Sequence, residues 1–263
     1  MITLENVCVT LGGSKILKDV DLRIEKGETG VILGSSGSGK TTILRVILGL
    51  VKPDCGSVQV NGDDVTAVDD AGLYKIREKI GMVFQGGALF DSLTVGENVG
   101  YRLKELRDME SEAIEEAVRK SLRFVGLEEA IDLMPAELSG GMKKRVAIAR
   151  GIASSPTILL YDEPTTGLDP VNSFNINTLI NRLRVEEGVT SVVVTHDLPS
   201  AFMVATKVAF LHEGIVAYSG KIDGLLKSRD EKALEFMRHS SCLTAYTGAD
   251  GPAGAGHEGR NIA

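Results

Sequence analysis

The sequence predicts an α/β fold in which an antiparallel β-subdomain is followed by a largely parallel sheet and a helical subdomain is inserted into the chain. Three observations lead to this prediction. Near the N-terminus, a stretch alternates apolar and polar residues as a half-buried antiparallel strand does. From about residue 86 to 155, apolar residues recur every three or four positions, which indicates helices. In the second half, apolar strand-like runs flank a helical segment, an order typical of parallel sheets.

Five strands are expected in the first 85 residues. A turn at Gly12 and Gly13 joins the first two strands. The fourth ends at the pair Asn61-Gly62, which is a strong signal for a tight turn. The fifth is a buried apolar run that leads to Gln85. We expect these strands over 2–7, 20–24, 31–33, 57–60 and 80–84.

A helical block and a second group of strands follow. The three-to-four-residue spacing predicts helices over 95–106, 111–125 and 140–153. Apolar runs then predict strands over 157–161, 190–194 and 208–211. A helix at 171–186 separates the first two of these strands, which gives a βαβ unit and hence parallel pairing. A hairpin at Glu213-Gly214 and helical segments to about residue 239 complete the ordered chain.

These elements predict one domain over residues 1–240. Its core covers about 1–85 and 156–240, and its helical subdomain covers about 86–155. The stretch 248–256 has almost no large apolar residue, so we expect a disordered tail over 241–263.

Composition limits the possible functions. The chain has 263 residues, 43% of them hydrophobic and 25% charged, as in a soluble globular protein. Its net charge of -7 argues against a nucleic-acid partner. No apolar run reaches the roughly 18 residues of a membrane span, and residues 1–5 have neither a basic nor a long apolar stretch, so we expect no membrane span and no signal peptide. We therefore expect a cytoplasmic protein. Its widely spaced cysteines and histidines predict unpaired thiols and no structural zinc site; the cysteines are Cys8, Cys55 and Cys242.

A glycine-rich loop between the strand at 31–33 and the following helix indicates phosphate binding. Glycines without Cβ atoms allow backbone N–H groups to turn toward phosphate oxygens, and the helix N-terminus adds further donors. Lys40 is placed to reach the β- and γ-phosphates, and the Thr41 hydroxyl can bind Mg²⁺. The loop consists of Gly34, Ser35, Ser36, Gly37, Ser38, Gly39, Lys40 and Thr41. The sequence therefore predicts a nucleotide-binding protein.

Two further motifs carry chemistry. The apolar run that begins at Ile158 ends in Asp162 and Glu163. Asp162 can hold Mg²⁺, and Glu163 can polarise a water that attacks the γ-phosphate. Ser139 can cap the helix after it, and the glycines that follow expose backbone N–H groups, so this helix start is a second candidate anion site.

Taken together, these motifs resemble the ATP-binding subunits of ABC transporters over about residues 2–240. The resemblance implies an ATPase with a P-loop NTPase core that uses ATP and Mg²⁺ and works as a homodimer bound to a membrane permease. The implied catalytic residues are Lys40, Gln85, Glu163 and His196. The implied metal ligands are Thr41, Gln85 and Asp162. The implied nucleotide contacts, besides the loop from Gly34 to Thr42, are Ser139, Gly140, Gly141, Met142 and Asp169.

The sequence departs from the general family pattern at two positions. Met142 stands where the family has glutamine, and Leu11 stands where an aromatic side chain usually stacks on adenine. The segments 84–91 and 133–142 are more closely similar to the ATPases of Mla and other MCE-type phospholipid transport systems. The general ABC resemblance implies a permease that docks near Gln85–Phe90. We expect Leu89 and Phe90 to be exposed there, and the alternative is that both pack under the helical subdomain. The closer resemblance implies an MCE-type protein reached through that permease and a position on the inner face of the cell membrane.

Two alternatives remain open at this point. An importer of a polar solute such as an amino acid would carry the same ATPase motifs. A soluble ABC protein of DNA repair, chromosome architecture or translation would belong to another class. Three observations argue against that second class: the chain has one phosphate-binding loop, it has no heptad repeat of a coiled coil, and its net charge is negative.

Overall fold

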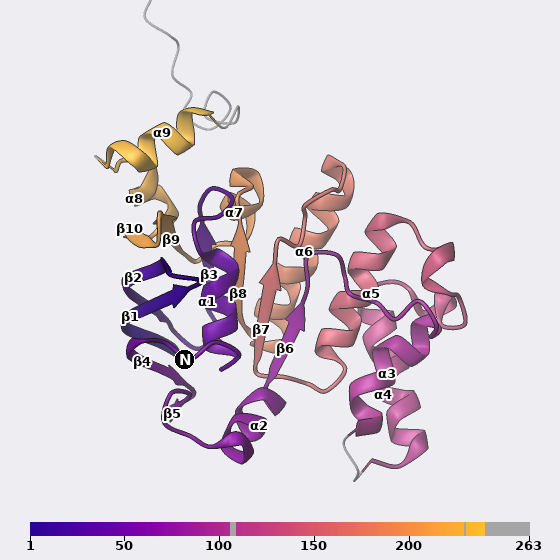
Figure 1. The fold of residues 1–263 in the computed structure, drawn as a ribbon. Coiled ribbons are helices and arrows are strands. Elements are labelled where there is room, and N and C mark those ends of the chain that lie inside the picture. The colour runs from indigo at the N-terminus through magenta and orange to yellow at the C-terminus, as the bar shows by residue number, and fades with distance from the viewer. Residues whose placement is uncertain (106–108, 229, 240–263) are drawn as a thin grey trace, which may run out of the picture.

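The computed structural model describes residues 1–105, 109–228 and 230–239. Figure 1 shows a small sheet on one side of a larger one and a group of helices on the other side. The small sheet has the strand order β2-β1-β4-β5 and the large sheet has the order β10-β9-β3-β8-β7-β6. The strands are β1 (Ile2–Leu11), β2 (Ser14–Ile24), β3 (Thr29–Leu33), β4 (Cys55–Val60), β5 (Asp63–Asp64), β6 (Ile80–Val83), β7 (Ile158–Asp162), β8 (Thr190–Thr195), β9 (Lys207–His212) and β10 (Ile215–Gly220).

Strand pairing confirms the predicted α/β fold. β1 pairs antiparallel with β2 and with β4. In the large sheet, β3 lies parallel to β8 and β9, and β7 lies parallel to β6 and β8. Only the β9–β10 hairpin is antiparallel among the pairs of this sheet in the described ranges. Every residue of β3, β7 and β8 is buried. Other elements cover both faces of these parallel strands, and this is why their sequences are mainly apolar and do not alternate.

The helices follow the predicted order, with two additions. They are α1 (Lys40–Ile47), α2 (Asp70–Glu78), α3 (Val95–Glu105), α4 (Ser111–Phe124), α5 (Gly140–Ile152), α6 (Pro170–Glu187), α7 (Leu198–Val204), α8 (Ile222–Leu226) and α9 (Glu231–His239), with 3-10 turns at Glu128–Ala130 and Pro135–Glu137. Neither α2 nor α7 was expected from the sequence. α2 has one buried residue, Ile76, so its apolar spacing gives little helical signal, and α7 has only seven residues. We call α3, α4 and α5 the helical block.

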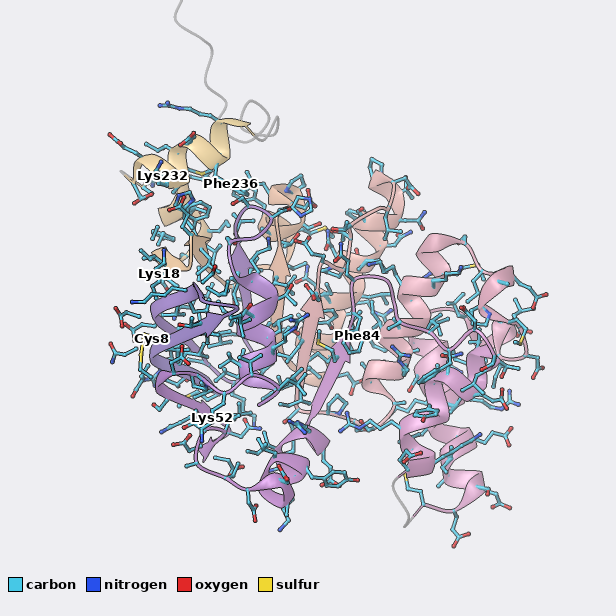
Figure 2. All side chains as sticks on the ribbon, viewed as in Figure 1. Cys8, Lys18, Lys52, Phe84, Lys232 and Phe236 are labelled. Carbon is cyan, nitrogen blue, oxygen red and sulfur yellow. A yellow bond between two sulfur atoms is a disulfide. The ribbon has the colours of Figure 1, made fainter. Side chains whose placement is uncertain are left out.

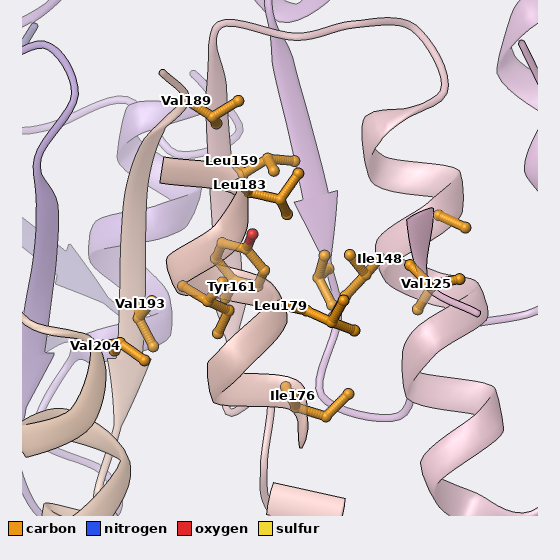
Figure 3. Close-up of a cluster of buried hydrophobic side chains, with 14 of the residues drawn as sticks. Val125, Ile148, Leu159, Tyr161, Ile176, Leu179, Leu183, Val189, Val193 and Val204 are labelled. Carbon is orange, nitrogen blue, oxygen red and sulfur yellow. The ribbon is translucent and has the colours of Figure 1, made fainter. Parts of the chain in front are cut away.

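Apolar packing joins the helical block to the large sheet. One cluster of buried side chains includes residues of α3, α4, α5, α6 and β7. Figure 3 shows Tyr161 of β7 among Leu179 and Leu183 of α6, with Ile148 of α5 and Val125 nearby. The α5 helix therefore packs against the same core that holds the end of β7. A second cluster fills the space between the small sheet, α1 and the other face of the large sheet.

The structure corrects the prediction of unpaired thiols. Cys8 of β1 and Cys55 of β4 are partners in the strand register, with Cα atoms 5.1 Å apart, and they form a disulfide. Figure 2 shows Cys8 on the outer side of the small sheet. The two residues are 47 positions apart, so only the strand register brings them together. Cys242 and the expected tail at 241–263 lie outside the described residues. Among the described helices, none has the length and apolar character of a membrane span.

Candidate functional site

The glycine-rich loop joins the end of β3 to the start of α1, as the sequence predicts. Two of its glycines are required by space. A Cβ atom on Gly34 would lie 2.3 Å from the carbonyl oxygen of Leu211, and one on Gly39 would lie 2.9 Å from Leu17 Cδ2. Gly39 also has a φ of +107°, a backbone conformation that residues with a Cβ atom rarely adopt. The loop therefore holds its tight shape because these positions lack side chains.

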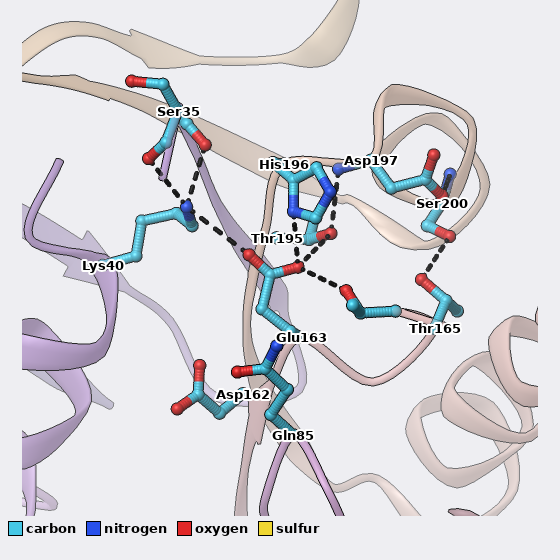
Figure 4. A network of polar contacts seen from close by, with 12 residues as sticks. Ser35, Lys40, Gln85, Asp162, Glu163, Thr165, Thr195, His196, Asp197 and Ser200 are labelled. Carbon is cyan, nitrogen blue, oxygen red and sulfur yellow. Dashed lines mark hydrogen bonds and ion pairs between the residues drawn. The ribbon is translucent and has the colours of Figure 1, made fainter. Parts of the chain in front are cut away.

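Lys40 places a buried cation under this loop. Its Nζ donates to the backbone oxygens of Gly34 at 2.9 Å and Ser35 at 3.0 Å, and it lies 3.4 Å from Glu163 Oε1 (Figure 4). The hydroxyl of Ser38 is buried and has no hydrogen-bond partner within the described ranges. The loop thus offers a cation and a spare hydroxyl to an anion such as a triphosphate.

The end of β7 brings Asp162 to the start of α1. The Thr41 hydroxyl donates to Asp162 Oδ1 at 3.1 Å. Burial raises the pKa of Asp162, while this hydrogen bond acts in the opposite direction. A carboxylate and a hydroxyl side by side next to a phosphate site form the donor set that Mg²⁺ binds. The residues present therefore fit a Mg²⁺-nucleotide complex.

Glu163 is held by neighbours on three sides. Its Oε2 accepts from Thr166 Oγ1 at 3.0 Å, lies 2.9 Å from His196 Nδ1, and is 3.4 Å from Thr195 Oγ1. Burial alone would raise the pKa of Glu163. The His196 hydrogen bond and charge, the Thr166 hydroxyl and the Lys40 charge outweigh burial and hold the pKa below its ordinary value. The side chain is therefore an ionised carboxylate at neutral pH, as a general base must be.

Lys40, Thr41, Glu163 and His196 face one cavity of about 380 Å³, whereas Ser38 and Asp162 do not line it. Nine of the residues predicted from the sequence line it: Ser36, Gly37, Gly39, Lys40, Thr41, Thr42, Gln85, Glu163 and His196. The structure therefore brings together residues that are up to 160 positions apart in the chain. Ile16 of β2 also lines the cavity, and the sequence analysis did not name it.

The remaining predicted residues do not line this cavity. Ser139 is exposed, and its Oγ caps α5 by accepting from the Met142 N–H at 3.3 Å. Asp169 is exposed and caps α6 by accepting from the Asn172 N–H at 2.9 Å. The two caps are adjacent, because a Cβ atom on Gly141 would lie 2.4 Å from Asn172 Oδ1. One chain therefore presents two separate surfaces, the phosphate cavity and the exposed start of α5.

The loop after Gln85 differs in part from its prediction. The sequence suggested exposed side chains at both Leu89 and Phe90. Phe90 is 43% exposed, and its ring lies 4.6 Å from that of Tyr101, which is equally exposed. Leu89 instead packs against the main apolar cluster, so its expected exposure is wrong. Phe84, on the other side of Gln85, is also 43% exposed and lies toward the helical block (Figure 2).

Sequence reasoning also missed Lys144. This lysine is buried in α5, and its Nζ donates to the backbone oxygens of Gln85 and Glu163. One signal was present, because Lys144 is four residues before the fully buried Ile148 and so shares its face of the helix. Thr166 and Thr195, which contact Glu163, carry no such signal.

Comparison with known proteins agrees with this geometry. The family model described as "ABC transporter" matches residues 17–166, which include the glycine-rich loop and the Asp162-Glu163 pair. The chain belongs to the ABC transporter family. Members of this family are ATP-binding cassettes, so the chain is an ATPase subunit.

Relatives of several kinds share this cassette. The chain is 36% identical over 241 residues to the intermembrane phospholipid transport system ATP-binding protein MlaF of Haemophilus influenzae, which covers 92% of this chain and 91% of that protein. It is 37% identical over 243 residues to the methionine import ATP-binding protein MetN 1 of Bacillus thuringiensis subsp. konkukian, covering 90% of this chain and 71% of that protein. Among solved structures, the ATP-binding cassette MJ0796, a dimer in a post-hydrolysis state bound to ADP and Pi, matches with a TM-score of 0.77 and 38% identity. That match covers 84% of this chain and 99% of the cassette.

Proposed function

We propose that this ABC ATPase hydrolyses ATP to drive phospholipid transport between membranes through a separate permease. The observation that carries the catalytic part is the position of the Glu163 carboxylate, 3.4 Å from the Lys40 ammonium beneath the phosphate-binding loop. The lipid part is supported by similarity to the phospholipid transport relative over nine-tenths of both chains. Met142 and the segment 86–90 support the same preference in the sequence.

Each residue of the cavity has a defined task in this proposal. Backbone N–H groups of the loop and the Lys40 ammonium hold the phosphates and stabilise the charge that develops on them. Glu163, ionised at neutral pH, orients a water and accepts its proton. His196 and Thr166 fix the direction of the Glu163 carboxylate through Oε2. Thr41, Asp162 and Gln85 would hold Mg²⁺, which would neutralise charge between the phosphates.

The working unit is proposed to be a head-to-tail homodimer. Ser139, Gly140 and Asp169 are exposed, whereas Gly141 is buried and Met142 is partly buried, and none of these five residues lines the cavity of its own chain. In a dimer these residues would close over the nucleotide of the other subunit, and two ATP molecules would be held at the interface. The solved cassette MJ0796 is described as a dimer.

We place the permease contact at Gln85–Phe90. The large exposed side chains on both sides of Gln85 are Phe84, Phe90 and Tyr101, and exposed aromatic side chains are typical anchors of protein interfaces. Nucleotide-dependent movement of Gln85 would reach the permease directly. Residues 86–155 would move as a helical subdomain against the core. The subunit would sit on the cytoplasmic face of the inner membrane, with an MCE-type protein reached through the permease and no nucleic-acid partner.

Transport in vesicles tests this function. The chain is purified with its permease, reconstituted into donor vesicles, and given fluorescent phospholipid and acceptor vesicles. We expect ATP to accelerate lipid transfer, and Glu163→Gln, which keeps the site's shape, to abolish the acceleration. ATP-dependent movement of methionine without any effect on lipid transfer would instead support the polar-solute importer.

A further inference from the structure

Lys144 links the helical block to both catalytic motifs inside one subunit. It is 6% exposed, on the buried face of α5 five residues after Ser139. Its Nζ donates to the backbone oxygen of Gln85 and, at 3.2 Å, to that of Glu163. One side chain of α5 therefore contacts the loop after β6 and the end of β7 at the same time.

The surroundings of this ammonium make its contacts difficult to replace. Burial lowers the pKa of Lys144, while the charges of Glu163 and Asp162 oppose that shift. A buried cation is unfavourable unless hydrogen bonds and opposite charges surround it, and Lys144 has both. Removing the ammonium would leave two carbonyl oxygens without this donor and two carboxylates without this countercharge.

The backbone of Glu163 adds an independent reason for such a contact. Glu163 has a φ of +49°, in the left-handed region that residues with side chains rarely adopt. Such a conformation persists only where surrounding contacts fix it, and it is often found at functional sites. Three contacts fix it here. The Glu163 N–H donates to the Val194 oxygen at 2.9 Å, and the Glu163 oxygen accepts from the Thr166 N–H at 3.3 Å and from Lys144.

We propose that Lys144 is a positioning residue for ATP hydrolysis, holding the Glu163 and Gln85 backbones so that the Glu163 carboxylate faces the phosphate-binding loop. This proposal rests on the role of Glu163 as the base, and it is independent of the transported cargo. Because Lys144 belongs to α5, a movement of the helical block also moves the contact that holds the base. The α5 helix would thus act on hydrolysis in its own subunit, in addition to closing over the nucleotide of the partner subunit.

Substitution of the lysine tests the proposal. Lys144→Met removes the charge and the donors while keeping the chain length, and Lys144→Arg keeps both. Lys120→Met, at an exposed lysine of α4, is the matched control. We expect Lys144→Met to lower kcat at least about 30-fold while KM and ATP affinity stay within about threefold, and Lys144→Arg to recover kcat to within about fivefold of wild type. If Lys144→Met does not fold, Lys144→Gln replaces it with the same expected direction. A folded Lys144→Met or Lys144→Gln with kcat within about threefold of wild type overturns the proposal.

A double-mutant cycle separates positioning from a general loss of structure. If Lys144 acts through the base, Lys144→Met added to Glu163→Gln should change the single-turnover rate less than about twofold. A further fall as large as in the wild-type background shows an independent structural effect and contradicts the proposal. If Glu163→Gln alone keeps full activity, the assignment of the base fails. If Glu163→Gln is inactive but Lys144→Met is active, only the role of Lys144 fails.

Discussion

The variant Phe90→Asp distinguishes two roles for the Phe90 ring, as part of a docking surface or as part of the structural core. Phe90 is 43% exposed and its ring contacts that of Tyr101, so the substitution removes a partly buried ring and one aromatic pair. A fully buried Phe contributes about 1.5–3 kcal/mol and an aromatic pair about 0.5–1.5 kcal/mol. We therefore expect unfolding to become easier by about 2 kcal/mol, which lowers Tm by about 4–8 °C in a chain of this size. ATP affinity should remain within about threefold of wild type.

The same substitution should weaken binding to the permease. An aromatic anchor at an interface is typically worth at least about 2 kcal/mol, which corresponds to about 30-fold in affinity. The assay combines a thermal melt, ATP binding and binding to the permease in lipid nanodiscs. Val185→Asp, at a 69% exposed residue near the end of α6, is the control and should bind the permease normally. Permease affinity within threefold of wild type for Phe90→Asp would refute the docking surface. A loss of ATP binding with a much larger fall in Tm would show that the ring belongs to the core.

Three further predictions concern the nucleotide and the carboxylates. Because Leu11 stands in place of a stacking aromatic, the affinity for GTP should lie within about tenfold of that for ATP, a difference in binding free energy of about 1.4 kcal/mol. Leu11→Tyr should tighten ATP binding by up to about 1–3 kcal/mol. A preference for ATP above a hundredfold in a competition assay would contradict this prediction. Ser139→Arg should block closure of the dimer and so abolish hydrolysis. A site built from two subunits would be contradicted if monomers hydrolysed ATP at a rate independent of protein concentration. Because the pKa of Glu163 is lowered in the folded state, its ionised form adds stability above its ordinary value of 4.5 and loses it at lower pH. The unfolding free-energy difference between wild type and Glu163→Gln should thus change in favour of the variant as the pH falls below about 4.5, as measured by denaturant titration; a change in the opposite direction would contradict this sign.

Most of the cavity could be predicted because its parts are local motifs. The loop from Gly34 to Thr41 needs only the strand before it and the helix after it. Asp162 and Glu163 follow an apolar run that fixes the end of a strand. Parallel strands place their carboxyl ends along one edge of a sheet, so these motifs meet once β3 and β7 share that sheet.

Features that depend on non-local packing could not be predicted in the same way. The Cys8–Cys55 disulfide requires the register between β1 and β4, which no spacing reveals. The different burial of Leu89 and Phe90 depends on where the helical block lies against the loop. Lys144 had an expected place on α5, but its two carbonyl partners follow the ends of two different strands, β6 and β7. Such contacts require the tertiary structure, because sequence periodicity identifies a buried face without identifying what covers it.

The kinetics of Glu163→Gln test the central claim most directly. The substitution keeps the size and shape of the side chain and removes the charge that orients the water. Loss of a general base typically lowers the rate by about 10²–10⁴-fold. With the purified dimer, we predict a fall of that size in kcat and an ATP Kd within threefold of wild type, whereas Lys40→Ala should weaken binding as well. A kcat for Glu163→Gln within threefold of wild type would contradict the assignment of Glu163 as the catalytic base.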